Sequence, residues 1–298
     1  MNKSVFILLA FACCAVSVRA EVTNVSREFP AKDVESMVIS AVSGDVDFKP
    51  ADGPVRIYVA RFDSEKCSLE TVVSSGQLTA TLRPAERARK NGEDDCSAGM
   101  AVSAPAAVKL DISAVSGNVS ANSARQEMKI GTVSGSITVI SAGGPVGIAT
   151  VSGPVSVRGA AQGLAVNTAS GGIEAENVAG GAKLSTVSGN MRVSGLAGQL
   201  KAETVSGNVS GSLYGTADVN TDSGAINLHW PKAPPSGEIS LSTINGDVGL
   251  FFPAGTKMDL SFLSRKGMRT GARFPSAGGK GLRVNITSMS GDLEMSAQ

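Results

Sequence analysis

Apolar and polar residues alternate along most of this chain, and a recurring Ser-Gly pair interrupts the alternation. In the central stretch the pair follows Thr-Val or a close variant, and successive copies stand 18 residues apart. The copies begin at Ala114, Thr132, Thr150, Thr168, Thr186 and Thr204, with looser copies at Thr221 and Thr243. A fixed period of this size is typical of a repeat architecture.

Each repeat contains two alternating segments, for example Val146 with Ile148 before the pair and Val155 with Val157 after it. A period of two predicts half-buried strands. Glycine-containing bends separate them, because glycine adopts backbone angles that other residues resist. The first apolar position of the second strand forms a predicted core row of Val119, Ile137, Val155, Ile173, Met191, Val209, Ile226 and Val248.

No single repeat can bury its apolar row, so the repeats must stack. We therefore predict an all-β fold, a single-stranded parallel β-helix or β-solenoid with about 18 residues per coil. We favour a right-handed coil, since right-handed crossovers dominate parallel connections. A left-handed β-helix and an antiparallel hairpin stack are the alternatives. The pattern leaves open whether the repeated threonines point inward.

Residues 1–20 have the features of a signal peptide: Lys3, an apolar run from Val5 to Val16, and the small-residue site Val18-Arg19-Ala20. Lipidation at Cys13 or Cys14 is the alternative. No other segment is long and apolar enough to cross a bilayer. We predict an exported protein of the periplasm or the cell surface.

Residues 21–298 are predicted to form one solenoid domain, with N-terminal coils (21–113), regular repeats (114–250) and C-terminal coils (251–298). A copy of the phrase at Ala41 stands 73 residues before the copy at Ala114, close to four periods. Val55–Ala60 and Gln77–Leu82 are predicted strands, and the charged stretch Arg83–Asp95 is a predicted solvated loop.

Cys67 and Cys96 flank that loop and are the only cysteines beyond the leader. Export implies an oxidising compartment, so we predict that they pair. A metal site is not expected, because two cysteines without a nearby histidine lack the usual ligand count.

The composition of the chain narrows the range of functions that it could have. The net charge of +1 argues against a dedicated nucleic-acid binder, and the 4% aromatic content implies an aliphatic core. The single histidine, His229, lies in a Pro-rich loop without a nucleophile motif. Glu174 and Glu176 lie two residues apart on one strand, a spacing that is compatible with glycosidase chemistry and common by chance. We predict no catalytic, cofactor-binding or metal-binding residues and no cofactor.

Two C-terminal features could contact other molecules. Trp230 and the pair Phe251-Phe252 are expected to cover an open end of the core or to pack under the Pro-rich loop, with a ligand-stacking platform as the alternative. The basic segment 257–283 is expected to be a solvated rim that blunts a sheet edge, or else a contact for anionic envelope material. Its candidate residues are Lys257, Arg265, Lys266, Arg269 and Arg273.

The Thr-Val-Ser-Gly-x-Val-x-Val phrase resembles the bacterial putative-adhesin domain family of unknown function. The passage Gly237 to Val248, continued by Phe252-Pro253-Ala254-Gly255-Thr256, and the ending Leu282 to Asp292 are similar to the same family. The resemblance covers roughly residues 35–298. It implies a β-helix on the extracytoplasmic side of the membrane and carries no catalytic or binding residues with it.

These features together predict a non-enzymatic, exported cell-envelope β-solenoid that acts as an adhesin-like scaffold or interaction surface. Its partner would be a protein or an envelope polymer. The alternatives are a carbohydrate-binding or carbohydrate-cleaving β-helix and a self-assembling fibre subunit.

Overall fold

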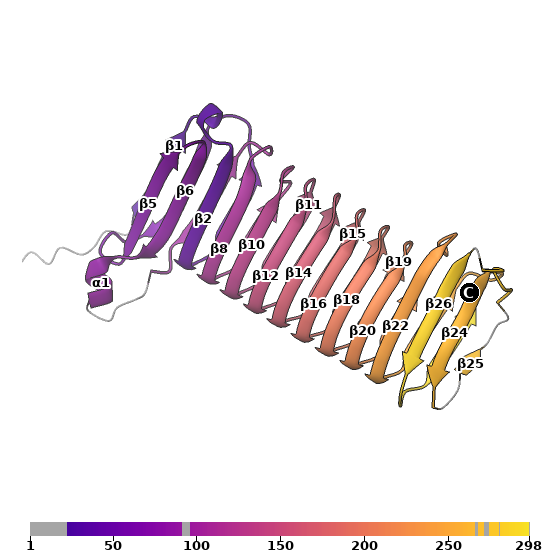
Figure 1. The fold of residues 1–298 in the computed structure, drawn as a ribbon. Helices are drawn as coiled ribbons and strands as arrows, with labels where there is room; N and C mark the ends of the chain where they lie inside the picture. Colours follow the sequence, from indigo (N-terminus) through magenta and orange to yellow (C-terminus); the bar gives the residue numbers. More distant parts are fainter. Residues whose placement is uncertain (1–22, 91–95, 266–267, 271–273, 280, 298) are drawn as a thin grey trace, which may run out of the picture.

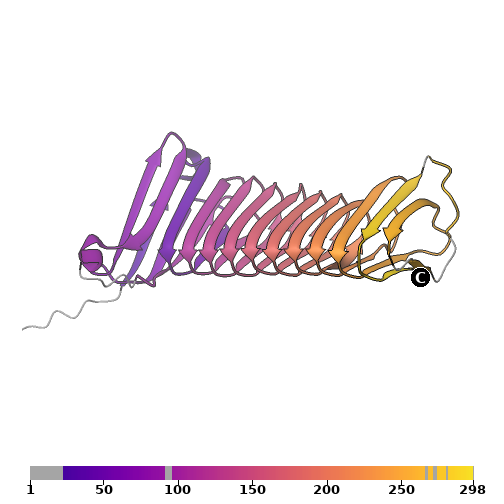
Figure 2. The ribbon, with the colours of Figure 1, turned by 60° about the horizontal axis from the view of Figure 1, so that its bottom comes forward.

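The computed structural model describes residues 23–90, 96–265, 268–270, 274–279 and 281–297. The predicted signal peptide lies outside these residues. The described strands form two long sheets that enclose one elongated, coiled body (Figures 1 and 2). The predicted all-β solenoid is thereby confirmed, and its handedness stays a prediction.

Sheet A has 14 strands and sheet B has 13. In spatial order, sheet A contains β1 (Thr23–Phe29), β4 (Val55–Phe62), β7 (Gly99–Ala104), β3 (Val46–Pro50), β9 (Val119–Asn122), β11 (Ile137–Ala142), β13 (Val155–Ala160), β15 (Ile173–Val178), β17 (Met191–Leu196), β19 (Val209–Leu213), β21 (Ile226–His229), β23 (Val248–Phe252), β27 (Leu293–Ala297) and β25 (Met268–Thr270). In spatial order, sheet B contains β24 (Met258–Ser264), β26 (Leu282–Ser288), β22 (Gly237–Asn245), β20 (Ala217–Ser223), β18 (Leu200–Ser206), β16 (Ala182–Ser188), β14 (Leu164–Ser170), β12 (Val146–Ser152), β10 (Met128–Ser134), β8 (Lys109–Ser116), β2 (Ser36–Ser43), β6 (Gln77–Pro84) and β5 (Cys67–Ser74).

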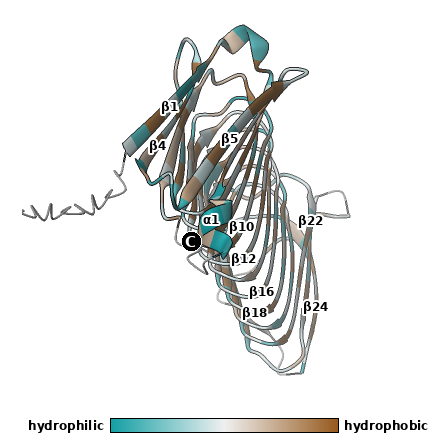
Figure 3. Ribbon diagram, turned by 90° about the vertical axis from the view of Figure 1, so that its left-hand side faces the viewer, coloured by the Kyte–Doolittle hydropathy of each residue, from teal (hydrophilic) through white to brown (hydrophobic). Residues whose placement is uncertain are grey.

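In the regular part, each coil gives one strand to each sheet, and equivalent residues of neighbouring coils pair in parallel. In sheet B, Met128 pairs with Val146, and Val146 pairs with Leu164. In sheet A, Ile137 pairs with Val155, and Val155 pairs with Ile173. The inward positions therefore stack into the predicted aliphatic rows, which are buried along the whole solenoid. Figure 3, seen from the N-terminal end, shows the coils behind one another with apolar and polar residues alternating along their strands.

The repeated threonines point inward, which answers the question that the sequence left open. Thr150, Thr168 and their equivalents continue the inward alternation of sheet B and are at most 7% exposed. Thr243 Oγ1 donates to the Gly224 carbonyl at 3.3 Å. The corresponding hydroxyls of six other coils are buried without a hydrogen-bond partner among the described residues: Thr132, Thr150, Thr168, Thr186, Thr204 and Thr221.

Thr168→Val is expected to stabilise the protein by about 1 kcal/mol, because a buried unpaired hydroxyl costs roughly 1–3 kcal/mol and valine keeps the β-branched shape. Thr243→Val is the matched control, because it removes a hydroxyl that has an acceptor. The control should be neutral or destabilising. Denaturant unfolding of both variants measures the difference, and equal losses of stability would contradict the assignment of unpaired hydroxyls.

The N-terminal end of the solenoid departs from the plain repeat. Ala41 pairs directly with Ala114, so the spacing of 73 residues does not represent four stacked coils. The intervening chain folds outward instead, and β1, β4 and β5 form antiparallel pairs at this end. The predicted strands at Val55–Ala60 and Gln77–Leu82 are present as β4 and β6.

Two short helices lie in this end region, at η1 (Ala31–Asp33) and α1 (Glu86–Lys90). The helix α1 corrects the prediction of a plain loop over Arg83–Asp95, whose residues 91–95 lie outside the described part. Ala88 is buried while Arg89 and Lys90 are exposed, so one apolar contact anchors this charged helix.

At the C-terminal end, the strands around the last copy of the repeated phrase, near Ser288, do not form the edge of either sheet. The coil β26–β27 lies between β22–β23 and the outer strands β24 and β25, although β24 and β25 precede it in the chain. Thr243 accordingly pairs with Ser288 across 45 residues of sequence. Both ends of the rod are therefore built from segments that the 18-residue period does not cover.

Candidate functional site

The disulfide is formed between Cys67 and Cys96, as predicted. Their Cα atoms are 5.1 Å apart, and both residues are buried. Cys67 begins β5, the edge strand of sheet B, and the Ser43 hydroxyl donates to the Cys96 carbonyl. The bridge thus fastens the outer N-terminal strands to the first coil, which is a structural role.

The paired carboxylates lie on the outer face of sheet A. Glu174 and Glu176 share β15, and Glu176 forms an ion pair with Arg158 Nε at 3.2 Å. In the neighbouring strands Glu174 stands between Ser156 and Arg192. A cation from an adjacent coil therefore flanks each carboxylate on the outer surface of the sheet.

Other acidic residues serve the turns. Asp45 Oδ1 accepts a hydrogen bond from the Asn118 amide at 2.8 Å, and Asp247 Oδ1 accepts one from the Asp292 amide at 2.7 Å. Each carboxylate thus caps the turn of the next coil, as their position after the turn glycine suggested. Within the described residues, no group of three or more His, Cys, Asp or Glu side chains could hold a metal ion.

Trp230 is fully buried and stacks on Phe252, with ring centroids 4.6 Å apart and planes 6° apart. Its Nε1 donates to the Gly215 carbonyl at 2.9 Å, and Phe274 meets Phe252 edge to face. The expected packing role is confirmed for Trp230 and Phe252, whose rings are buried, whereas Phe251 is only partly buried. His229 lies at the end of β21, beside Ser212 and Phe251 of the flanking strands.

The basic segment is only partly described. Lys257 and Arg265 are exposed, and Arg269 lies on the edge strand β25 in register with Glu294. The candidate residues Lys266 and Arg273 lie outside the described part. The structure therefore brings two of the five predicted cations to the described surface near β24.

Asp259 is the only acidic residue of that segment, and it organises the loop that follows. Its carboxylate accepts hydrogen bonds from the Ser276 hydroxyl at 2.7 Å and from the amides of Ala277 and Gly279 at 3.0 and 2.7 Å. The hydrogen bond from Ser276, followed by those from the backbone amides, lowers the pKa of Asp259. The carboxylate is thus held in local structure as an ionised group, one negative charge against the seven Lys and Arg residues between positions 257 and 283.

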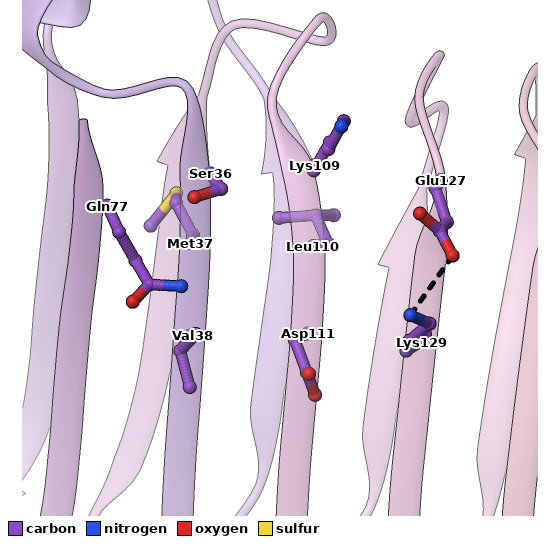
Figure 4. Close-up of a pocket in the computed structure, with 9 residues that line it drawn as sticks. All are labelled: Ser36, Met37, Val38, Gln77, Lys109, Leu110, Asp111, Glu127 and Lys129. Atoms are coloured by element: carbon purple, nitrogen blue, oxygen red, sulfur yellow. Dashed lines mark ion pairs between the residues drawn. The ribbon is translucent and has the colours of Figure 1, made fainter. Parts of the chain in front are cut away.

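The hollows on the surface are shallow. One of about 200 Å³ lies on the outer face of sheet B between β2, β6, β8 and β10 (Figure 4). The side chains of Glu127 and Lys129 form an ion pair at 3.1 Å along its rim. A second hollow of about 420 Å³ lies between the loops 231–235 and 253–257 and carries Lys232 and Lys257. Small-molecule sites normally enclose most of a ligand in a cavity of about 300–1,000 Å³, which these open depressions do not do.

A surface feature that the sequence analysis missed runs along the outer face of sheet B. The second residue of each phrase from Ala41 to Thr204 is apolar, and its valines are about half exposed, from 40% at Val42 to 55% at Val187. Asp222 interrupts the row, and Ile244 and Met289 occupy the same position in the later phrases. Each side chain is the last but one of its strand, so the row follows the arrowheads of sheet B in Figure 1. We call this row the valine stripe: Val42, Val115, Val133, Val151, Ala169, Val187 and Val205.

The valine stripe had a signal in the sequence. Val146, Ile148 and Thr150 point inward, so the period of two requires that Val151 points outward. The serine that follows then reaches the neighbouring coil: Ser134 and Ser152 donate to the carbonyls of Val115 and Val133 at 3.4 and 3.3 Å. These hydrogen bonds hold the stripe in register from coil to coil.

These observations define a class of protein: a two-sheet β-solenoid whose acidic residues and aromatic cluster serve structural roles and whose outer surface repeats from coil to coil. Residues 99–296 match the family Toastrack DUF4097, a domain of unknown function, and the chain belongs to this family. No curated protein matches the chain. Among the helices that the structure describes, none is long and apolar enough to cross a membrane.

One solved structure supports the fold. A crystal structure named a "putative adhesin" from Bacteroides fragilis NCTC 9343 is 14% identical, has a TM-score of 0.52, and is matched over 71% of this chain and 98% of its own. A second "putative adhesin", from Parabacteroides distasonis ATCC 8503, is 13% identical with a TM-score of 0.36 over 92% of this chain and 98% of its own. The first of these shows the shared fold, and at such identities no more than the fold.

Proposed function

We propose that this protein is a non-enzymatic, exported cell-envelope β-solenoid that acts as an adhesin-like scaffold or interaction surface. The observation that carries the proposal is the repeating outer surface, on which equivalent side chains stand on successive coils from β2 to β22. Solenoids use such extended surfaces for binding. The name of the Bacteroides fragilis structure, "putative adhesin", agrees with this proposal.

Export is supported by two separate features. The leader 1–20 has a basic start, an apolar run and a small-residue cleavage site. The Cys67–Cys96 disulfide fits an oxidising compartment. Both features favour a mature chain that begins near Glu21 and works in the periplasm or on the cell surface.

Crosslinking in intact cells of the source organism, followed by mass spectrometry, tests the proposal. Crosslinks from lysines on the outer faces, such as Lys183 and Lys201, to another envelope component would support it. Recovery of uncleaved chain in the cytosol, or crosslinks to cytosolic proteins alone, would overturn it.

The basic segment is proposed to contact anionic envelope material. Replacing Arg265, Lys266 and Arg269 by Ser should weaken binding to anionic vesicles by up to roughly 100-fold at low salt, because each cation near such a surface contributes about 1 kcal/mol. The binding of the wild type to anionic vesicles should weaken as the salt concentration rises, because the Debye length is only about 8 Å at physiological ionic strength.

The matched control removes three exposed cations from the middle of the rod, by replacing Lys183, Arg192 and Lys201 with Ser. Both triple variants lose the same charge, so an equal loss of binding would indicate a net-charge effect and would contradict a local contact. Circular dichroism should show the same β-sheet content in both.

A further inference from the structure

The valine stripe is an uncharged apolar row bounded by one charge of each sign. At its C-terminal end the next strand, β20, carries exposed Asp222 at the equivalent position. Asp222 separates the stripe from Ile244 of β22, which is apolar and exposed in the same row. At its N-terminal end the next strand is β6, where Leu82 pairs with Ala41, so Arg83 stands beside Val42. Arg83 is exposed and lies 3.3 Å from Glu70 of its own chain.

The outward row next to the stripe is also nearly free of charge, and the row beyond it carries Asp111, Lys129, Lys183 and Lys201. The adjacent outward row of sheet B consists of small or uncharged polar residues until Glu203 on β18. From β2 onward this row is Ser40, Ser113, Gly131, Ala149, Asn167 and Ser185. Charged side chains normally cover an exposed sheet face, and their depletion is typical of the centre of an interface.

We infer that the valine stripe is the contact surface of a two-fold symmetric dimer, in which two copies of this solenoid lie side by side and antiparallel. This inference rests on the proposed interaction function and names the partner of one outer surface. The side chains of the stripe repeat at the strand spacing of about 4.8 Å over many coils. A second copy repeats at the same spacing, so each side chain of the stripe can face a side chain of the partner's stripe along the whole contact without drifting out of register.

The charges at the two ends select the register. Counting strands from β6 to β20, Val151 on β12 is the central position, with four strands on either side. A two-fold axis through Val151 therefore places Arg83 of one copy opposite Asp222 of the other, at both ends of the contact. The same axis pairs Val42 with Val205, Val115 with Val187, and Val133 with Ala169. Closed two-fold interfaces are the commonest in homo-oligomers, and this surface is complementary to itself in that arrangement.

The available area is sufficient for such a dimer. Eight strand intervals and three side-chain columns span roughly 38 by 17 Å, or about 650 Å² per copy. Two copies would then bury about 1,300 Å², which lies within the range of about 1,200–2,000 Å² for specific interfaces. In this dimer the two rods contact each other along their sides, whereas a fibre would grow by contacts between their ends.

Sedimentation equilibrium of the full chain, purified with its disulfide intact, tests the inference. The wild type should be dimeric at micromolar concentration. Val151→Glu brings two like charges together on the two-fold axis and should weaken dimerisation on the order of 100-fold. The matched control is Ile140→Glu on the outer face of sheet A, a position that is 39% exposed; it should leave the dimer intact.

Charge reversal tests the register. Asp222→Arg should weaken the dimer, because it faces Arg83 of the other copy, and the added change Arg83→Asp should restore it. In addition, a short bifunctional maleimide should link two copies of Val151→Cys and should fail to link two copies of Ile140→Cys.

A monomeric wild type at every concentration, or a dimer that tolerates Val151→Glu, would overturn the inference. A dimer weakened by Val151→Glu but insensitive to both charge reversals would overturn the Val151-centred register. Growth into large assemblies that Val151→Glu leaves unchanged would assign self-association to the ends of the rod and would also overturn the inference.

The proposed function can fail independently of the dimer. A cytosolic location would contradict it even if the dimer forms, and a monomer that crosslinks to envelope components would still support it.

Discussion

Val155→Asp is expected to lower the free energy of unfolding by about 4–5 kcal/mol, because it buries an unpaired charge at a position that is 1% exposed. Val155 lies between Ile137 and Ile173 in one core row, so the new carboxylate would be surrounded by buried apolar side chains. In a solenoid, stability is roughly the sum of coil stabilities and of contacts between neighbouring coils. The substitution should therefore open the coils around β13 before the ends of the rod melt.

Hydrogen exchange measured by mass spectrometry is the suitable readout, because it resolves which coils open. Ile140→Asp is the matched control on the preceding strand: Ile140 faces solvent and pairs with Arg158, so the change should cost less than about 0.5 kcal/mol. Unchanged protection of β11, β13 and β15 in Val155→Asp would show that the proposed core row is wrong.

The core of this solenoid was predictable because two periods in the sequence agree. The 18-residue repeat places equivalent residues side by side, and the alternation within each strand selects which of them point inward. Val155 and Ile148 satisfy both periods. The Cys67–Cys96 bridge was predictable for a different reason, since only two cysteines remain after the leader and export favours their pairing.

The valine stripe was not predicted because two signals conflict at Val151. Its apolar character suggests burial, whereas its place after Thr150 in the alternation requires exposure, and the adjacent turn seemed to end the alternation. The structure shows that the alternation continues to the end of the strand. A repeated apolar residue at an outward position was therefore the available sign of a binding surface.

The ends of the rod could not be predicted from periodicity. Ala41 pairs with Ala114, although the spacing of 73 residues between them is close to four coils. Sequence spacing does not show on which side of an existing coil a new strand is added, and the antiparallel strands β1, β4 and β5 follow no repeat. The same limit applies to β26, which inserts between β22 and β24.

Glycine is required at the Ser-Gly turns for a second reason, which could not be predicted from the sequence. Left-handed backbone angles were expected at the Ser-Gly turns, and Gly153 has a φ of +142°. Gly189 is not among the residues with positive φ, yet a Cβ atom there would collide with the backbone carbonyl of Gly171 in the preceding coil. Close stacking of the turns, rather than the backbone angle alone, therefore excludes a side chain at this position.

Gly189→Ala is accordingly expected to destabilise the protein by about 3 kcal/mol, at the upper end of the cost of overpacking, because the clash is with backbone and no side-chain rotation relieves it. The matched control is Gly131→Ala in β10, where an added Cβ would meet no atom within 4 Å. Alanine there should be neutral or slightly stabilising, since it reduces the freedom of the unfolded chain. Denaturant unfolding of the two variants measures the difference. Similar stabilities for Gly189→Ala and Gly131→Ala would mean that the turns can separate without cost, and that their stacking does not set the spacing of the coils.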